Sequence, residues 1–314
     1  MRAGALRIVR RRIDGVVLLD KPHGWSSNHA VQAVKRAYRA ERAGHTGTLD
    51  PLATGLLPIC LGEATKFSAG LLDADKEYVA GVRLGITTAT GDAEGEVLQT
   101  RAVAVDDRSL EAALAALRGE IDQVPPMYSA LKRDGRPLYE YARAGLEVER
   151  KPRRVMIHTL ELLERDADLL RLRVVCSKGT YVRVLAEDLG RALGCGAHLA
   201  ALRRTRVGSL SLGQGVTPER LEALDESARD RILLSADALV AELPEAHLAA
   251  GEEALLLRGQ PVRGGAGPAG ATRVYGHTGD FLGLAERAVD GTLHPRRLRR
   301  ADPPANLAKG TDSQ

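Results

Sequence analysis

Hydrophobic and polar positions along the chain follow two different periods, which predicts a protein that mixes strands with helices. The unbroken apolar run over 15–20, GVVLLD, predicts a buried strand, and the segment 78–85 predicts another. Over 170–174 leucine and valine alternate with arginine, which is the pattern of a half-buried strand.

The segment 26–38 predicts an amphipathic helix. Ser26, Ser27 and Asn28 offer an N-cap. Apolar residues then recur at helical spacing, namely Ala30, Val31, Val34, Ala37 and Tyr38. Further helices are expected over 107–119 and 183–194, and from Thr217-Pro218 onward.

The order of these elements predicts the fold class. Strands and helices follow one another without a regular β-α-β alternation, which favours an α+β fold over a doubly wound parallel sheet. A glycine-rich segment over 262–270 precedes three short strand-like pieces at 272–275, 281–286 and 292–298. We therefore expect a large first domain and a small C-terminal β domain.

Composition limits the class of protein. The chain has 314 residues, of which 44% are hydrophobic and 27% charged, as in ordinary globular proteins. It contains no apolar run long enough for a transmembrane helix and no apolar core of a secretory signal, so no membrane association is expected. Cys60, Cys176 and Cys195 match neither a metal-site spacing nor a disulfide framework, which favours a reducing, cytoplasmic location.

Positive charge is clustered although the formal net charge is only +4. Arginines crowd the first twelve residues, and Arg296, Arg297, Arg299 and Arg300 lie near the end. Lys35, Arg36 and Arg39 lie mostly off the apolar stripe of the first helix. Such clusters suit the phosphates of a nucleic acid, and solvated surface charge is the simpler alternative.

One short loop-like stretch carries candidate chemistry. The sequence GHTGTLDPLATG, residues 44–55, places the carboxylate of Asp50 among glycines and threonines with His45 just before it. Asp50 precedes Pro51, so it could simply cap a short helix through Leu52, Leu56 and Leu57. A positioned carboxylate is also a competent nucleophile, and the residues alone leave both interpretations open.

Residues 44–67, GHTGTLDPLATGLLPICLGEATKF, resemble the catalytic motif of the TruB-type tRNA pseudouridine synthases. The resemblance extends in the same order from about residue 13 to residue 300. Its further motifs are DKP at 20–22, DKEY at 75–78, MYSALK at 127–132, LYEYAR at 138–143, CSKGTYVR at 176–183, GCGAHL at 194–199 and LRR at 202–204.

The resemblance implies a role for each matching position. Asp50 would be the catalytic nucleophile, with attack at C1′ of the ribose or at C6 of the uracil both open. Tyr78 would stack against the target base, and His45 would press into the RNA loop. Tyr181 and Arg183 would line the pocket, with Arg183 paired to Asp50. The supporting positions would be Lys21, Lys66, Asp92 and Leu202. Tyr181 and Arg183 would share one face if their segment is extended. Backbone contacts to RNA are expected from Lys35, Arg36, Arg39, Arg296 and Arg297.

The family resemblance also implies fold and activity. It implies a pseudouridine synthase fold, with a mixed, largely antiparallel central sheet flanked by helices and a small PUA-like β domain. The expected organisation is a basic extension over 1–12, a catalytic domain over 13–245, an RNA-binding domain over 246–300 and a disordered tail over 301–314. The implied reaction is isomerisation of uridine 55 in the T-arm of tRNA, after the base has been flipped out of its stack. The enzyme would need no metal and no organic cofactor, and it would act as a monomer without an obligate protein partner.

Three other functions compete with this one. A non-catalytic RNA-binding protein would share the basic clusters and the β domain. A guide-dependent pseudouridine synthase would require a ribonucleoprotein. A base-excising glycosidase would use a carboxylate near a ribose and release free uracil.

Overall fold

The computed structural model describes residues 10–129 and 131–300. Most of the predicted basic extension and all of the predicted tail over 301–314 lie outside the described residues. Within the described ranges, no helix is both long enough and apolar enough to cross a membrane.

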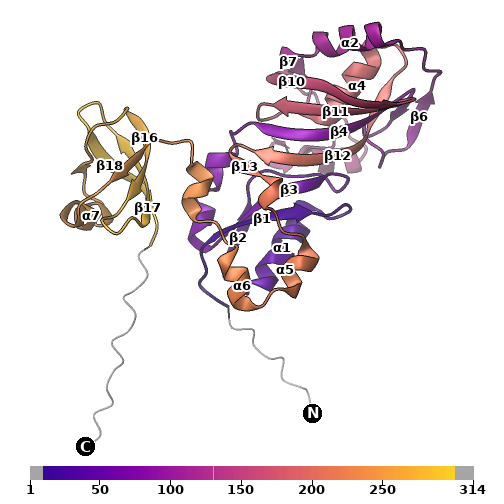
Figure 1. Cartoon of the computed structure of the whole chain (residues 1–314). Helices are drawn as coiled ribbons and strands as arrows, with labels where there is room; N and C mark the ends of the chain where they lie inside the picture. The colour runs from indigo at the N-terminus through magenta and orange to yellow at the C-terminus, as the bar shows by residue number, and fades with distance from the viewer. Residues whose placement is uncertain (1–9, 130, 301–314) are drawn as a thin grey trace, which may run out of the picture.

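The first domain is built on a nine-stranded sheet (Figure 1). Its strand order is β1-β3-β12-β4-β11-β10-β7, with β2 paired to β3 and β13 paired to β12. The strands are β1 Gly15–Lys21, β2 Ala43–His45, β3 Thr54–Leu61, β4 Lys76–Leu84, β7 Gly119–Gln123, β10 Arg153–Asp166, β11 Leu169–Cys176, β12 Ala197–Val207 and β13 Leu210–Ser211. Every pairing in this sheet is antiparallel except that of β3 with β12. The predicted mixed, largely antiparallel α+β fold is therefore confirmed.

Helices cover parts of the sheet. In Figure 1, α1, α5 and α6 lie by β1, whereas α2 lies at the end formed by β7 and β10. Helix α4 packs against β12 and β4 in the middle of the sheet. These helices are α1 Ser27–Ala37, α2 Asp107–Ala116, α4 Val182–Ala192, α5 Pro218–Ala223 and α6 Glu226–Arg231. The core between them is filled mainly by valine, leucine and alanine, as a chain with 3% aromatic residues requires.

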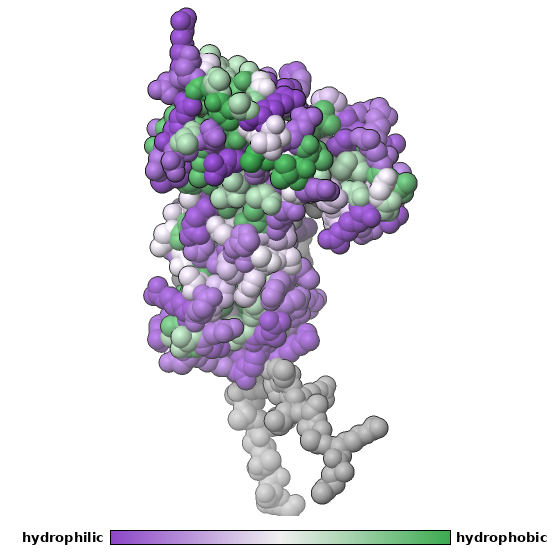
Figure 2. All heavy atoms as spheres, turned by 90° about the vertical axis from the view of Figure 1, so that its right-hand side faces the viewer, coloured by the Kyte–Doolittle hydropathy of each residue, from purple (hydrophilic) through white to green (hydrophobic). Residues whose placement is uncertain are grey.

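Smaller elements project from this domain. Strands β5 Ile86–Thr88 and β6 Val97–Thr100 form one hairpin, and β8 Lys132–Arg133 and β9 Arg136–Pro137 form another before α3 Leu138–Arg143. Figure 2 views the molecule from the side of β6, and apolar residues gather in the upper part of that face. Val97 and Leu98 of β6 are among the exposed apolar residues of the chain.

The C-terminal segment forms a second, five-stranded sheet in the order β14-β16-β17-β18-β15. Its elements are β14 Glu245–His247, α7 Ala250–Leu257, β15 Val262–Arg263, β16 Gly270–Tyr275, β17 Phe281–Arg287 and β18 Thr292–Leu298. It has a hydrophobic core of its own. It joins the first domain where Phe281 meets Phe67 of the 3-10 helix η1 Gly62–Leu71, with ring centroids 5.1 Å apart. Two further 3-10 segments, η2 Leu212–Gln214 and η3 Ala236–Val240, follow β13 and α6.

The helix that Asp50 was expected to cap does not exist. Leu56 and Leu57 belong to β3, which lies between β1 and β12 and is buried along almost its whole length. Leucine has a good helix propensity, but pairing with two neighbouring strands and burial on both faces override that local preference. Asp50 therefore lies in a loop.

Candidate active site

Asp50 lies in the loop that joins β2 to β3, and the turn before α1 holds this loop on both sides of it. The Ser27 hydroxyl donates to the Leu49 carbonyl at 2.9 Å and accepts from the Leu49 N–H at 2.8 Å. The Gly24 N–H donates to the Pro51 carbonyl at 2.9 Å. The two residues that flank Asp50 are thus fixed, whereas its own side chain is 44% exposed.

A buried arginine on β12 supports the same loop from beneath. Arg204 is 1% exposed, and its Nε donates to the Leu56 carbonyl at 2.7 Å. Its two terminal nitrogens donate to the carbonyls of Thr48 and Gly47 at 3.4 and 3.3 Å. Gly55 permits this approach, since its φ is +97° and an added Cβ would lie 2.3 Å from the Arg204 carbonyl oxygen.

Arg183 joins Asp50 to a second carboxylate. One terminal nitrogen of the guanidinium lies 3.0 Å from the carboxylate of Asp50, and the other lies 3.5 Å from that of Asp92. The side chains of Arg183 and Asp92 are 6% and 5% exposed, so that pair is almost fully buried. The expected pairing of Arg183 with Asp50 is present in the structure.

Further hydrogen bonds fix both partners of this network. Arg183 donates to the carbonyls of Tyr128 and Thr90 at 2.7 and 3.2 Å. Asp92 accepts from the Thr90 hydroxyl at 2.5 Å and from the Glu94 N–H at 3.1 Å. The guanidinium is therefore aimed at Asp50 from a rigid position, which orients the carboxylate.

Tyr181 and Arg183 are not placed by an extended segment. Tyr181 is the N-cap of α4 and Arg183 lies in its first turn, so the condition of an extended segment is not met and the helix expected from residue 183 is present. Gln123 satisfies the Tyr181 backbone, accepting from its N–H at 3.0 Å and donating to its carbonyl at 3.3 Å. Burial raises the pKa of the Tyr181 hydroxyl, and Asp50 is among the charges that raise it further.

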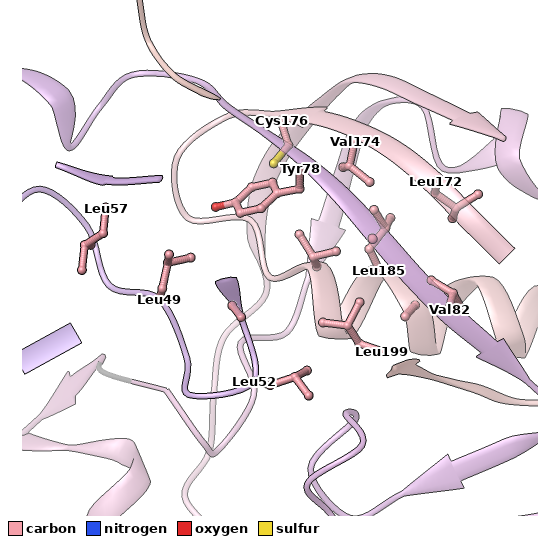
Figure 3. Packing of buried hydrophobic residues seen from close by; sticks show 14 of the residues in the cluster. Leu49, Leu52, Leu57, Tyr78, Val82, Leu172, Val174, Cys176, Leu185 and Leu199 are labelled. Carbon is pink, nitrogen blue, oxygen red and sulfur yellow. The ribbon is translucent and has the colours of Figure 1, made fainter. Parts of the chain in front are cut away.

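Tyr78 lies on β4 at the floor of the site and is 9% exposed. Figure 3 shows its ring beside Cys176, with the hydroxyl directed toward Leu49 and Leu57. Burial raises the pKa of this hydroxyl, Arg204 opposes the shift, and Asp50 adds to it. Tyr78 and Tyr181 therefore both lie within electrostatic range of Asp50.

Lys21 ends β1 behind the loop and is fully buried. Its ammonium donates to the carbonyls of Trp25 at 2.6 Å and Pro22 at 3.0 Å, with Pro51 at 3.5 Å. Burial lowers the pKa of Lys21 to about 8, although the nearby carboxylate of Asp50 favours the charged form. Lys21 thus contacts both the turn before α1 and the loop that carries Asp50.

His45 lies at the end of β2, just before the Asp50 loop. Burial lowers the pKa of His45, and the Arg204 charge lowers it further, so the neutral imidazole is favoured. Among the described residues, neither the buried His45 Nδ1 nor the buried Thr46 hydroxyl has a hydrogen-bond partner. Leu202 of β12 lies nearby and half-buried, and its carbonyl accepts from the Thr54 hydroxyl at 3.4 Å.

Lys66 has a different environment from the one expected of a supporting catalytic residue. Its ammonium lies 2.5 Å from the Glu63 carboxylate and donates to the Leu298 carbonyl at 3.0 Å. Arg297 donates in turn to the Lys66 carbonyl at 2.6 Å. These contacts join η1 to β18, so the polar contacts of Lys66 hold the two domains together.

The remaining basic residues expected to contact RNA occupy separate surfaces. Lys35 and Arg36 lie in the last turn of α1, and Arg39 follows this helix in an ion pair with Glu226. Arg296 lies on β18, is exposed and is 4.0 Å from Glu286. The structure does not bring these residues together with Asp50.

Sequence reasoning missed two residues that build this site. Ser27 was expected only as part of an N-cap, and Arg204 was noted only within the LRR motif. A lone serine or arginine carries no local signal for a loop contact 22 or 156 residues away along the chain. Within the described ranges no three His, Cys, Asp or Glu side chains are grouped to hold a metal ion. The arrangement offers one oriented, accessible carboxylate held by a buried arginine, which suits nucleophilic chemistry.

Comparison with known proteins identifies this arrangement. The chain is 61% identical over 289 residues to the tRNA pseudouridine synthase B of Aromatoleum aromaticum, covering 92% of this chain and 94% of that protein. It is 56% identical over 302 residues to the protein of the same name from Cupriavidus metallidurans, covering 93% and 96%. Among solved structures, a chain of the archaeal box H/ACA sRNP Nop10–Cbf5 complex matches at a TM-score of 0.69 and 26% identity, over 90% of this chain and 85% of that one.

The chain thus has the fold of a pseudouridine synthase and is an isomerase of uridine in RNA. Residues 35–182 match the N-terminal domain model of the TruB family pseudouridylate synthases. Residues 183–241 match the tRNA pseudouridylate synthase B C-terminal domain, and residues 244–298 match the C-terminal domain of pseudouridine synthase II TruB. The chain belongs to the TruB family.

Proposed function

We propose that this enzyme isomerises uridine 55 in the T-arm of tRNA to pseudouridine, with Asp50 as the nucleophile. The relatives named above are tRNA pseudouridine synthases that match along almost the whole chain, which supports tRNA as the substrate. The single observation that carries the proposed chemistry is the accessible Asp50 carboxylate held 3.0 Å from the buried Arg183.

The reaction breaks the C1′–N1 bond of the uridine, turns the uracil and joins C5 to C1′. The proton on C5 is lost and N1 gains one, so the change is an intramolecular transfer that needs no oxidant or reductant. Asp50 attacks the ribosyl–uracil unit and holds one fragment while the other turns. Arg183 keeps the carboxylate aimed, and Asp92 and the carbonyls of Thr90 and Tyr128 keep Arg183 in place.

The target base must leave its stack before Asp50 reaches it, which costs a few kcal/mol. Stacking on an aromatic ring returns about 1–3 kcal/mol per base, and Tyr78 and Tyr181 line the site for that purpose. His45 is favoured in its neutral form, which suits insertion among RNA bases. The exposed basic residues of α1 and β18 contact the phosphate backbone.

We further propose that the enzyme acts as a cytoplasmic monomer without a guide RNA. Its three cysteines are buried and unpaired, which fits a reducing compartment. The 246–300 segment acts as a PUA-like RNA-binding domain, and the catalytic domain spans 13–245.

The test is incubation of the purified chain alone with an unmodified tRNA transcript, followed by mapping of carbodiimide-resistant adducts. We expect one adduct, at position 55. Release of free uracil would instead indicate a glycosidase, and product formed only after addition of a guide RNA would indicate a ribonucleoprotein enzyme. Binding of tRNA without product under any of these conditions would indicate a non-catalytic RNA-binding protein.

A further inference from the structure

Trp25 and His29 form a stacked aromatic pair beside the catalytic loop. Their ring centroids are 4.3 Å apart and the rings are within 12° of parallel. Trp25 lies in the turn between β1 and α1, which are neighbours in Figure 1, and His29 lies in the first turn of α1. Trp25 is the one tryptophan in a chain that has only 3% aromatic residues.

The turn that carries this pair is hydrogen-bonded to the segment that carries Asp50. The Trp25 carbonyl accepts from the Lys21 ammonium at 2.6 Å, and the preceding Gly24 donates to the Pro51 carbonyl at 2.9 Å. Ser27, between the two rings in sequence, makes both of the Leu49 hydrogen bonds. The turn and the Asp50 loop therefore behave as one rigid unit at the rim of the site.

The stack has one free end, and it is His29. Trp25 is half-buried and packs against the hydrophobic core, whereas His29 is exposed. The Ser26 hydroxyl caps the helix by accepting from the His29 N–H at 3.1 Å, which fixes the backbone but leaves the imidazole free. A flat ring, backed by a larger anchored ring and open to solvent, is a preformed surface for one more planar group.

We infer that the outer face of His29 is a stacking site for an unpaired base of the bound RNA, next to the uridine that enters the catalytic site. Proteins recognise single-stranded RNA by stacking splayed bases on aromatic side chains, histidine included. The bound base would continue the stack that Trp25 and His29 form. This inference rests on the proposed RNA-modifying function and adds a second contact, separate from Asp50, Tyr78 and Tyr181.

Binding affinity tests the site without relying on turnover. The full chain carrying Asp50→Asn would be titrated with an unmodified T-arm stem–loop, with and without a second substitution at position 29. His29→Ala is expected to weaken binding about fivefold to tenfold, the lower part of the range for one stacked base. His29→Phe keeps a ring and should bind like the parent, whereas His29→Lys supplies a charge without a ring and should bind like His29→Ala.

Two controls separate stacking from other roles. His23→Ala removes an exposed histidine of the same turn that is not part of the stack, and it should leave the affinity unchanged. A fully paired RNA duplex has no base to offer, so His29→Ala should not change its binding. Because Trp25 is the sole tryptophan, its fluorescence should respond to the stem–loop in the parent protein and much less in His29→Ala.

The inference is overturned if His29→Ala binds the stem–loop as well as the parent, or if His29→Lys restores binding. Equal weakening toward the duplex would also overturn it, since the contact would then be to the backbone. Failure of the proposed function is a different result: wild-type enzyme would form no pseudouridine on tRNA whatever the position-29 variants do to binding.

Discussion

Replacing Arg183 by methionine should destabilise the protein chiefly through Asp92. The substitution leaves the 5% exposed carboxylate of Asp92 without its cation. Breaking a buried ion pair in this way costs roughly 3–5 kcal/mol. Asp92 keeps its hydrogen bonds from Thr90 and Glu94, which places the expected loss near the lower limit, about 3 kcal/mol. The other partner, Asp50, is 44% exposed, so solvent screens its ion pair with Arg183. Loss of that pair adds less than about 1 kcal/mol to the destabilisation.

Thermal unfolding measures this effect. For a chain of 314 residues a loss of 3 kcal/mol lowers Tm by roughly 4–5 °C. A second substitution, Asp92→Asn, removes the uncompensated charge and should recover about 1–2 kcal/mol in the Arg183→Met background. Arg173→Met is a matched control, because Arg173 pairs with Glu77 at 3.0 Å but is 43% exposed, and it should cost less than about 1 kcal/mol.

Arg183→Met should also lose catalytic activity, and by more than its lower stability would explain. Without the guanidinium the carboxylate of Asp50 loses its orientation, and we expect single-turnover pseudouridine formation to slow by about 100-fold or more. The reasoning would be refuted if Arg183→Met and Asp92→Asn had additive effects on Tm, or if Arg183→Met unfolded at the same temperature as Arg173→Met.

Three further predictions concern the supports of the site. Burial lowers the pKa of Lys21 from 10.5 to about 8. Between about pH 8 and pH 10.5 the unfolded chain therefore binds more protons than the folded protein at this group. The contribution of Lys21 to the free energy of unfolding consequently rises with pH across this range. Lys21→Met should remove that rise, and a Tm difference from wild type that stays constant between about pH 7.5 and pH 10 would contradict this account. Arg204→Lys cannot span the three carbonyls that Arg204 binds, so kcat should fall about tenfold or more with KM little changed; a change confined to KM would instead place Arg204 in RNA binding. Lys66→Met removes an interdomain contact, so protease cleavage between the domains should become faster while kcat at saturating tRNA stays within about twofold; a large loss of kcat would place Lys66 in the catalytic site.

Local patterns in the sequence were sufficient for many elements. The strand over 15–20 appears as β1 because its unbroken apolar run is buried on both faces, and the helix over 26–38 appears as α1 because it buries a face of helical period. The helices expected over 107–119 and 183–194 appear as α2 and α4. The alternation over 170–174 lies within β11.

Non-local contacts decided the rest. Whether the leucines after Asp50 form a helix or a strand depends on β1 and β12, which no local pattern shows. Arg204 reaches the loop carbonyls of Thr48 and Gly47, 156 and 157 residues away along the chain, because β3 and β12 pair in parallel. The motif resemblance placed Asp50 and Arg183 in one site, but it placed Lys66 there too, and the polar contacts of Lys66 join η1 to β18 instead.

Release of label from C5 of uridine tests the central claim most directly, because the new C5–C1′ bond replaces the C5–H bond. tRNA transcribed with tritium at uridine C5 would be mixed with excess wild-type enzyme or with Asp50→Asn. The account predicts release of one tritium per tRNA by the wild type and none by Asp50→Asn, which should still bind tRNA with an affinity within a few-fold of wild type. Release by Asp50→Asn at the wild-type rate would contradict it.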